Sequence, residues 1–147
     1  MSYLEEFETA WSDPKNTAIT TPDSDVNATI AKHYIVDKPF TYTKTQLWDM
    51  EIKKAHHPDK YLRHLVQPGS LQILDHSKDG QFEYFIRITE QRTWKDPEVY
   101  ATVIERVCLD HANQNAIFLG VPEITLHDGT RLSSGEDLGR ELIRKEL

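Results

Sequence analysis

Cysteine and long apolar runs are scarce in this sequence. Its one cysteine, Cys108, excludes an intrachain disulfide, and its neighbours Val107 and Leu109 indicate a buried strand in which the thiol is structural. The N-terminus is acidic and carries no apolar run, so we expect neither a signal peptide nor a transmembrane span. These absences predict a cytoplasmic location.

Basic clusters are scarce as well. The chain has 24 acidic and 17 basic side chains, and its net charge is -7. An acidic surface repels the phosphate backbone of nucleic acids and the headgroups of anionic lipids. We therefore predict no nucleic-acid partner and no membrane partner.

The usual cofactor and nucleophile motifs are also missing. There is no Gly-rich phosphate loop, no Gly-x-Ser-x-Gly elbow and no Cys-x-x-Cys pair, so nucleotide, serine-hydrolase and redox-cofactor chemistry are not expected. His56, His57 and His64 invite a metal interpretation. Adjacent helical residues point about 100° apart, however, and no His-x-x-x-His pair occurs, so surface histidines at a helix end are favoured. We predict no cofactor and no bound metal.

The residues that are present fit one globular domain. A chain of 147 residues with 38% hydrophobic side chains can bury a core that needs no crosslinks. Residues 1–27 are predicted to form an N-terminal arm, with a short helix over 2–10 and a linker rich in turn residues. Residues 28–147 are predicted to form a single domain with a ligand pocket.

Local patterns predict the elements of this domain. Thr43 and Gln46 fit a capping box at a helix start, Pro58 permits a second helix at its first turn, and Asp79-Gly80 is a hairpin signal. The predicted helices span 43–57, 58–66 and 136–146. The predicted strands span 28–36, 71–74, 81–92, 99–109 and 116–121, the last with a continuation through 124–126.

The order of these elements indicates the α+β class. Hairpin-linked strands with helices on one side predict a curved antiparallel sheet of five to seven strands wrapped around the helices, with a central cavity. The first two helices would form the lid of this cavity, and strands 82–92 and 99–109 its floor. A cone-shaped NTF2-like fold is the structural alternative, although that fold opens with long helices rather than a strand.

Several short segments carry a family resemblance. They are Thr43-Lys44-Thr45-Gln46-Leu47-Trp48, Lys54-Ala55, Pro58-Asp59-Lys60-Tyr61 and Val103-Ile104-Glu105-Arg106-Val107. Over residues 28–120 the chain resembles the SRPBCC superfamily, also called START or Bet v 1-like, and within it the small AtaL-like proteins. The resemblance implies a helix-grip fold whose hydrophobic pocket serves cyclases, dehydratases, other lyases or non-catalytic carriers. Fold analogy does not choose among them.

Glu105 is the main catalytic candidate. On its face of strand 99–109 it is a lone carboxylate among apolar residues. An apolar cavity disfavours the charged form of a carboxylate, which raises its pKa and suits it to general acid–base catalysis. The alternative is that Glu105 forms an ion pair with a cross-strand Arg or Lys and has no catalytic role.

The neighbouring strand supplies the other catalytic candidates. One face of strand 82–92 carries Tyr84 within an apolar run and Glu90 and Arg92 at its end. Tyr84 could polarise a carbonyl or hold an enolate, Glu90 is a second carboxylate, and Arg92 could bind a ligand carboxylate. The remaining predicted pocket residues are Tyr34 or its neighbour His33, Trp48, Tyr61 and Trp94; for Trp48 and Tyr61, core packing is the alternative.

These residues predict a cofactor-independent enzyme of small-molecule metabolism, with secondary metabolism as one expected setting. A cyclase, dehydratase or isomerase would use Glu105 as the acid or base and Tyr84 as the oxyanion partner. Its partner would be a small hydrophobic or aromatic metabolite, and the sequence leaves a homodimer open. One alternative is a carrier that binds such a metabolite without transforming it. Another is a protein-interaction module that uses exposed tryptophans and the N-terminal arm.

Overall fold

A computed structural model describes residues 3–15, 18–19, 26–34, 41–93, 95–135 and 143–146. Its helices are α1 (Tyr3–Ser12), α3 (Val26–His33), α4 (Lys44–His56) and α5 (Pro58–Tyr61). Its strands are β1 (Ala18–Ile19), β2 (Gln72–Asp79), β3 (Phe82–Arg92), β4 (Tyr100–Asp110), β5 (Asn115–Gly120), β6 (Glu123–Thr125), β7 (Arg131–Ser133) and β8 (Ile143–Glu146). The α+β class is confirmed. Within these ranges, no helix is both long and apolar enough to cross a membrane.

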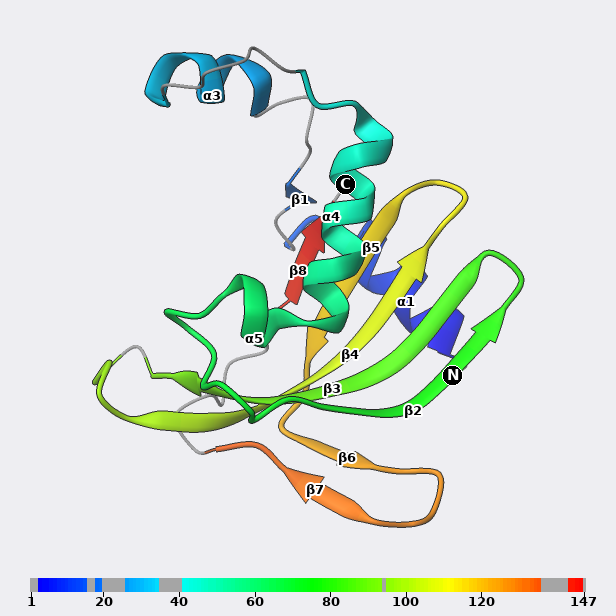
Figure 1. Cartoon of the computed structure of the whole chain (residues 1–147). Helices are drawn as coiled ribbons and strands as arrows, with labels where there is room; N and C mark the ends of the chain where they lie inside the picture. Colours follow the sequence, from blue (N-terminus) through cyan, green and yellow to red (C-terminus); the bar gives the residue numbers. More distant parts are fainter. Residues whose placement is uncertain are drawn as a thin grey trace.

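One twisted sheet forms the centre of the structure (Figure 1). Strands β2 to β5 follow one another as an antiparallel meander, β8 pairs antiparallel with β5, and β1 pairs parallel with β8. The order across the sheet is therefore β1-β8-β5-β4-β3-β2. Strands β6 and β7 form a separate antiparallel hairpin.

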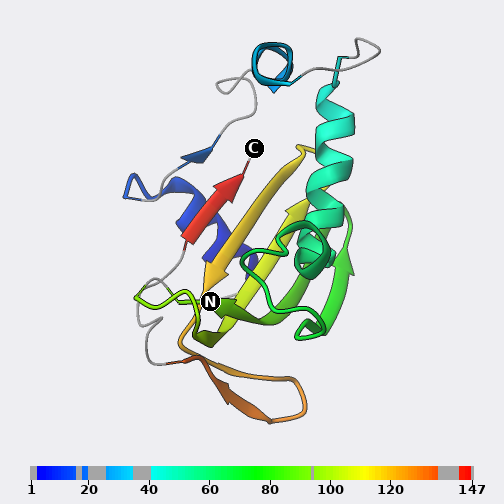
Figure 2. The same ribbon diagram turned by 60° about the vertical axis from the view of Figure 1, so that its left-hand side comes forward.

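Both faces of the sheet are covered, and Figure 2 shows α4 and α1 on opposite sides of it. On the side covered by α4, which we name the α4 face, the core includes Trp48, Ala55, Phe85, Val107, Leu109 and Phe118. Under α1, the buried residues are Phe7, Cys108, Ile117 and Leu119. Under the β6–β7 hairpin, they are Ile86, Ile88, Ile104 and Ile124. The sheet therefore separates two apolar layers.

The elements with local sequence signals form as predicted. The Thr43 hydroxyl accepts a hydrogen bond from the backbone N–H of Gln46 at 3.2 Å, and the Gln46 side chain accepts from the Thr43 N–H at 2.9 Å, so the capping box is confirmed. Pro58 occupies the first turn of α5, although α5 ends at Tyr61 rather than at residue 66. Gly80, with φ of 58°, makes the hairpin turn between β2 and β3.

The strand predicted over 28–36 is wrong, because residues 26–33 form helix α3. β-branched residues favour a strand only where a neighbouring strand and a core face can receive them. No residue of α3 is buried, and α3 lies beyond the end of α4, away from the sheet (Figure 1). The Asn27 side chain instead bonds the backbone of Tyr42 on both sides, accepting from its N–H at 2.7 Å and donating to its C=O at 3.1 Å.

The helix predicted over 136–146 is also wrong at its C-terminal end. Residues Ile143–Glu146 form β8, which pairs with β5 from Leu119↔Ile143 to Ala116↔Glu146. Without β8, the edge of β5 would expose unpaired backbone groups, and pairing at that edge outweighs a weak helix preference. Residues 136–142 lie outside the described residues.

Candidate functional site

The strand register separates the two main catalytic candidates. Glu105 pairs directly opposite Arg87, whereas Tyr84 pairs opposite Cys108. Directly opposed residues of antiparallel strands project to the same face, and adjacent positions alternate. Glu105 therefore lies on the α4 face and Tyr84 on the other, so the predicted joint site of Glu105 and Tyr84 on one floor is wrong.

Glu105 is held in a buried ion pair. The Arg87 side chain donates from Nε at 2.9 Å and from Nη2 at 2.6 Å to Oε2 of Glu105, and the two residues are 2% and 1% exposed. Arg87 also donates from Nη1 to the carbonyl of Ala55 at 3.0 Å, and its guanidinium lies 4.7 Å from the centre of the Phe118 ring. The alternative that Glu105 pairs with a cross-strand arginine is confirmed. The pair ties the last turn of α4 to the sheet.

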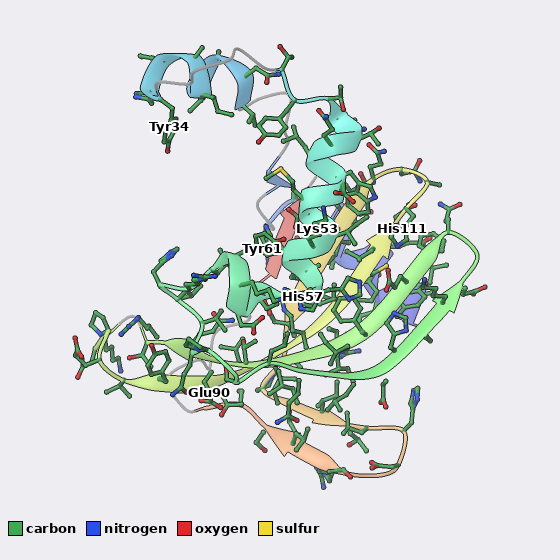
Figure 3. All side chains as sticks on the ribbon, viewed as in Figure 1. Tyr34, Lys53, His57, Tyr61, Glu90 and His111 are labelled. Carbon is green, nitrogen blue, oxygen red and sulfur yellow. The ribbon has the colours of Figure 1, made fainter. Side chains whose placement is uncertain are left out.

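Glu90 and Arg92 lie at the C-terminal end of β3, where their side chains form hydrogen bonds with neighbouring strand and loop residues. Glu90 accepts a hydrogen bond from the Thr102 hydroxyl at 2.7 Å. Arg92 donates to the carbonyls of His64 at 2.9 Å and Pro97 at 2.5 Å. In Figure 3, Glu90 lies at the opposite end of the sheet from His111. The guanidinium that was predicted to bind a ligand carboxylate thus holds two backbone carbonyls.

The predicted wall residues do not form one wall. Trp48 is buried in the core of the α4 face, as the alternative of core packing predicts. Tyr34 and His33 are exposed at the end of α3, and Tyr61 is exposed at the end of α5. Trp94 lies outside the described residues.

The structure instead brings together four residues that the sequence analysis did not select as a site. Glu83 on β3 is buried, and three imidazoles converge on its carboxylate. The Nε2 atoms of His56 and His76 lie 3.1 Å and 2.6 Å from Oε2 of Glu83, and Nε2 of His111 lies 2.8 Å from Oε1. We name these four residues the Glu83 cluster. The carboxylate side chain is 5% exposed, whereas the imidazoles are 27%, 40% and 37% exposed in the same order.

Four separate elements position these side chains. His56 is the last residue of α4, and His111 follows β4 in the turn to β5. A bulge between Leu74 and Ser77 puts an extra residue into β2 at His76. Bulges re-aim the side chains of the strand that carries them. His76 faces Glu83 across the β2–β3 hairpin, seven residues away, whereas His56 and His111 come from segments about 27 residues away on either side of Glu83 in the sequence.

Phe85 is the platform under two of the imidazoles. Its ring stacks with that of His56 at a centroid distance of 4.8 Å and with that of His76 at 6.1 Å. On the other side of the cluster, Trp48 meets His111 edge-on at 5.7 Å. Buried aromatic rings thus restrict how the imidazoles can turn.

The carboxylate fixes the tautomer of the three rings. An ionised carboxylate offers only acceptors, so each imidazole nitrogen that faces it carries a proton. Nε2 of His56, His76 and His111 is then the donor, and Nδ1 of each neutral ring keeps its lone pair. A carboxylate that orients an imidazole and stabilises its charged form is the arrangement that makes a histidine an effective base.

Charge and burial set the protonation of the cluster. Burial would raise the pKa of Glu83, but hydrogen bonds from His76 and His111 and the charge of His56 and His76 outweigh it and hold that pKa below its ordinary value. Burial is the largest influence on His56 and lowers its pKa, against the opposing effect of the Glu83 charge. At neutral pH the cluster therefore pairs an ionised carboxylate with a neutral His56.

These two shifts predict that acid weakens the fold. Both pKa values are lower in the folded state, so the unfolded state binds more protons. His56 contributes fully to the free energy of unfolding above its ordinary pKa of 6.5, and Glu83 does so above its ordinary pKa of 4.5. Each contribution is lost as the pH falls through the lower pKa of the folded state. We expect the free energy of unfolding in urea to fall from pH 7 to pH 4. His56→Gln should reduce the upper part of this fall, and His64→Gln, on an exposed side chain, should not; a stability that rises toward pH 5 would contradict the assignment.

No metal site is preformed in the parts of the chain that the structure describes. Within them, no group of three or more His, Cys, Asp or Glu side chains has the geometry to hold a metal ion. In the Glu83 cluster, two imidazole nitrogens approach one carboxylate oxygen and the third approaches the other. The contacts are thus those of hydrogen bonds.

Comparison with known proteins adds no further constraint. The chain matches no family model, no curated protein and no solved structure. The resemblance to the SRPBCC superfamily therefore stays a prediction, and the candidate site depends on the geometry of its own residues.

Proposed function

We propose that this protein is a cofactor-independent enzyme that moves protons on a small organic molecule, and that the Glu83 cluster is its catalytic centre. The observation that carries the proposal is the convergence of three partly exposed imidazoles on one buried carboxylate. Cyclisation, dehydration and isomerisation each need a base and an acid close together. His56 can supply both functions in turn, because an imidazole that takes a proton from the substrate becomes the acid that returns it.

His56 is the base in this proposal. Its lowered pKa keeps the ring neutral at pH 7, and Nδ1 is the nitrogen that does not face Glu83. When Nδ1 takes a proton from the substrate, the charge of Glu83 stabilises the imidazolium. The His56 imidazolium then returns this proton from Nδ1 to another atom of the same molecule, while His76 and His111 hold the Glu83 carboxylate in place. Glu83 acts as the positioning residue of the cluster, because it is buried beneath the rings.

We also propose the substrate class, the fold relationship and the cellular location that were predicted from the sequence. We infer a small hydrophobic or aromatic substrate, as predicted from the sequence, and the partly exposed imidazoles are the part of the cluster that it can reach. A helix-grip relationship to the SRPBCC superfamily and a cytoplasmic location are part of the same proposal. The support for the fold relationship is a meander of antiparallel strands with α4 across one face.

Deuterium exchange tests the function without a known substrate. A library of small carbonyl compounds is incubated with the protein in D₂O, and mass spectrometry measures deuterium gained at carbon. We expect the wild-type protein to label at least one compound, and Glu83→Gln to lower that rate by about 10²- to 10⁴-fold, the range for a lost acid–base group. His64→Gln is the matched control and should keep the rate. Labelling that is absent from the wild type, or equal in Glu83→Gln, would contradict the proposal.

A non-catalytic carrier is the second candidate function. It is favoured by an apolar groove of about 280 Å³ on the face of the sheet opposite the Glu83 cluster. A carrier needs no titrating group, so it predicts that wild type and Glu83→Gln bind a ligand equally and that neither labels it.

A further inference from the structure

The groove lies between α1 and the strands β3, β4 and β5. Its apolar lining consists of Leu4, Phe7 and Trp11 from α1 and Phe82, Cys108 and Ile117 from the sheet. Its volume of about 280 Å³ is just below the range of about 300–1,000 Å³ that is usual for ligand sites. The groove is therefore large enough for one ring or a short chain, and too small for a lipid.

Aromatic rings dominate the walls of the groove. Trp11, Phe7 and Phe82 line it directly. Tyr84 packs behind them, with ring centres 6.0 Å from Phe7 and 6.2 Å from Phe82. The faces of aromatic rings carry partial negative charge and attract organic cations, and such cages of rings recognise quaternary ammonium groups.

The charges at the groove have the same sign. Glu8 and Asp110 line it, and no basic side chain is among the described residues that do so. Burial is the main reason why the pKa of Tyr84 is raised, and electrostatic effects of Cys108 and then of Asp79, Glu8 and Asp110 add to it. Two carboxylates therefore place negative charge at the groove, in a protein whose net charge is already -7, and the nearby Arg106 is paired with Glu6.

The two lining carboxylates differ in how they can meet a ligand. Asp110 already accepts hydrogen bonds from Gln81 at 2.9 Å and from the backbone and side chain of Asn113 at 3.1 Å and 2.8 Å. These bonds hold the Asp110 charge in a fixed place. Glu8 is exposed on α1 and can move toward a bound group. A ligand without N–H groups suits this setting, because it needs charge and aromatic contact more than new hydrogen bonds.

We propose that this groove binds a small organic ammonium ion with an apolar body. The apolar body lies against Phe7, Trp11 and Phe82, and the ammonium group lies toward Glu8 and Asp110. The site is separate from the Glu83 cluster, because the sheet stands between them. The proposal goes beyond the catalytic one, because the acid–base chemistry of the Glu83 cluster does not indicate an ammonium ligand.

Titration by NMR with three simple probes tests this proposal. The probes are benzyltrimethylammonium, the neutral benzyl alcohol and the anionic benzoate. We expect benzyltrimethylammonium to bind more tightly than the other two, with shift changes at Phe7 and at the Trp11 indole. Equal affinity for benzyl alcohol or benzoate, or shift changes centred on His56 and His111, would overturn the proposal.

Two charge-neutralising variants of α1 make the test specific. Glu8→Gln should weaken benzyltrimethylammonium binding by about two- to fivefold, which corresponds to about 0.4–1 kcal/mol for an exposed charge contact. Glu5→Gln makes the same charge change on an α1 residue that does not line the groove, and should leave affinity unchanged. Equal affinity of wild type and Glu8→Gln would overturn the proposal. Glu83→Gln should bind the probe like the wild type, so failure of the catalytic proposal and failure of this one are distinguishable.

Discussion

Replacing Glu105 with leucine should lower the free energy of unfolding by about 3–5 kcal/mol, the cost of leaving a buried charge without its partner. Arg87 is 2% exposed and stays charged in a protein, and among the residues that the structure describes it would keep the carbonyl of Ala55 as a hydrogen-bond acceptor and the ring of Phe118. Urea unfolding measures the change. A loss below about 1 kcal/mol would mean that the pair contributes little.

The matched control for this prediction removes both charges. Arg87→Met combined with Glu105→Leu replaces the ion pair by apolar side chains of similar length, an exchange that is often neutral or stabilising. We expect the double variant to recover most of the stability that Glu105→Leu loses, which a double-mutant cycle expresses as a coupling energy. A double variant as unstable as the single one would contradict a role in charge compensation.

Replacing Phe85 with alanine should cost about 3–5 kcal/mol, because it removes a ring that is 2% exposed and leaves a cavity in the core of the α4 face. Thermal or urea unfolding measures this loss. Phe85→Leu keeps most of the volume and should cost less than about 1.5 kcal/mol.

The leucine variant separates packing from positioning. Phe85→Leu lacks the ring that stacks with His56 and His76. We expect the imidazole signals of these two histidines to shift and broaden in a protein that remains folded. Unchanged imidazole signals would show that Phe85 does not position them.

Sequence reasoning succeeded where the signal is local. The Thr43 capping box needs residues three positions apart, the first turn of α5 needs Pro58, and the hairpin at Gly80 needs a residue that tolerates positive φ. Each of these features is decided by a few neighbouring residues. They therefore appear in the structure where they were predicted.

It failed where distant segments decide the outcome. Residues 28–33 have β-branched side chains but no neighbouring strand, so they are helical. Residues 143–146 have a helical pattern but meet the open edge of β5, so they form a strand. Neither partner can be identified from the pattern of the segment itself.

The candidate site was missed for a related reason. The face of β3 that carries Glu83, Phe85 and Arg87 has a mixed polar and apolar pattern, whereas the predicted pocket residues come from the more apolar face of Tyr84. Helix α4 covers this face of the sheet, and the buried charged residues there are paired: Arg87 with Glu105, and Glu83 with His56. From the sequence, His56 is interpreted only as a surface histidine at a helix end. The packing of α4, the strand register and a bulge in β2, rather than any motif, bring His56, His111 and His76 to Glu83.

The central claim is that Glu83 organises the three imidazoles, and the pKa of His56 tests it most directly. Nitrogen-15 NMR across a pH titration gives the pKa and the protonated nitrogen of each ring in wild type and in Glu83→Gln. In the wild type, His56, His76 and His111 should carry their proton on Nε2 at neutral pH. The carboxylate raises the pKa of His56 against the effect of burial, so this pKa should fall further below 6.5 in Glu83→Gln. A pKa of His56 that stays the same or rises in Glu83→Gln would contradict the account.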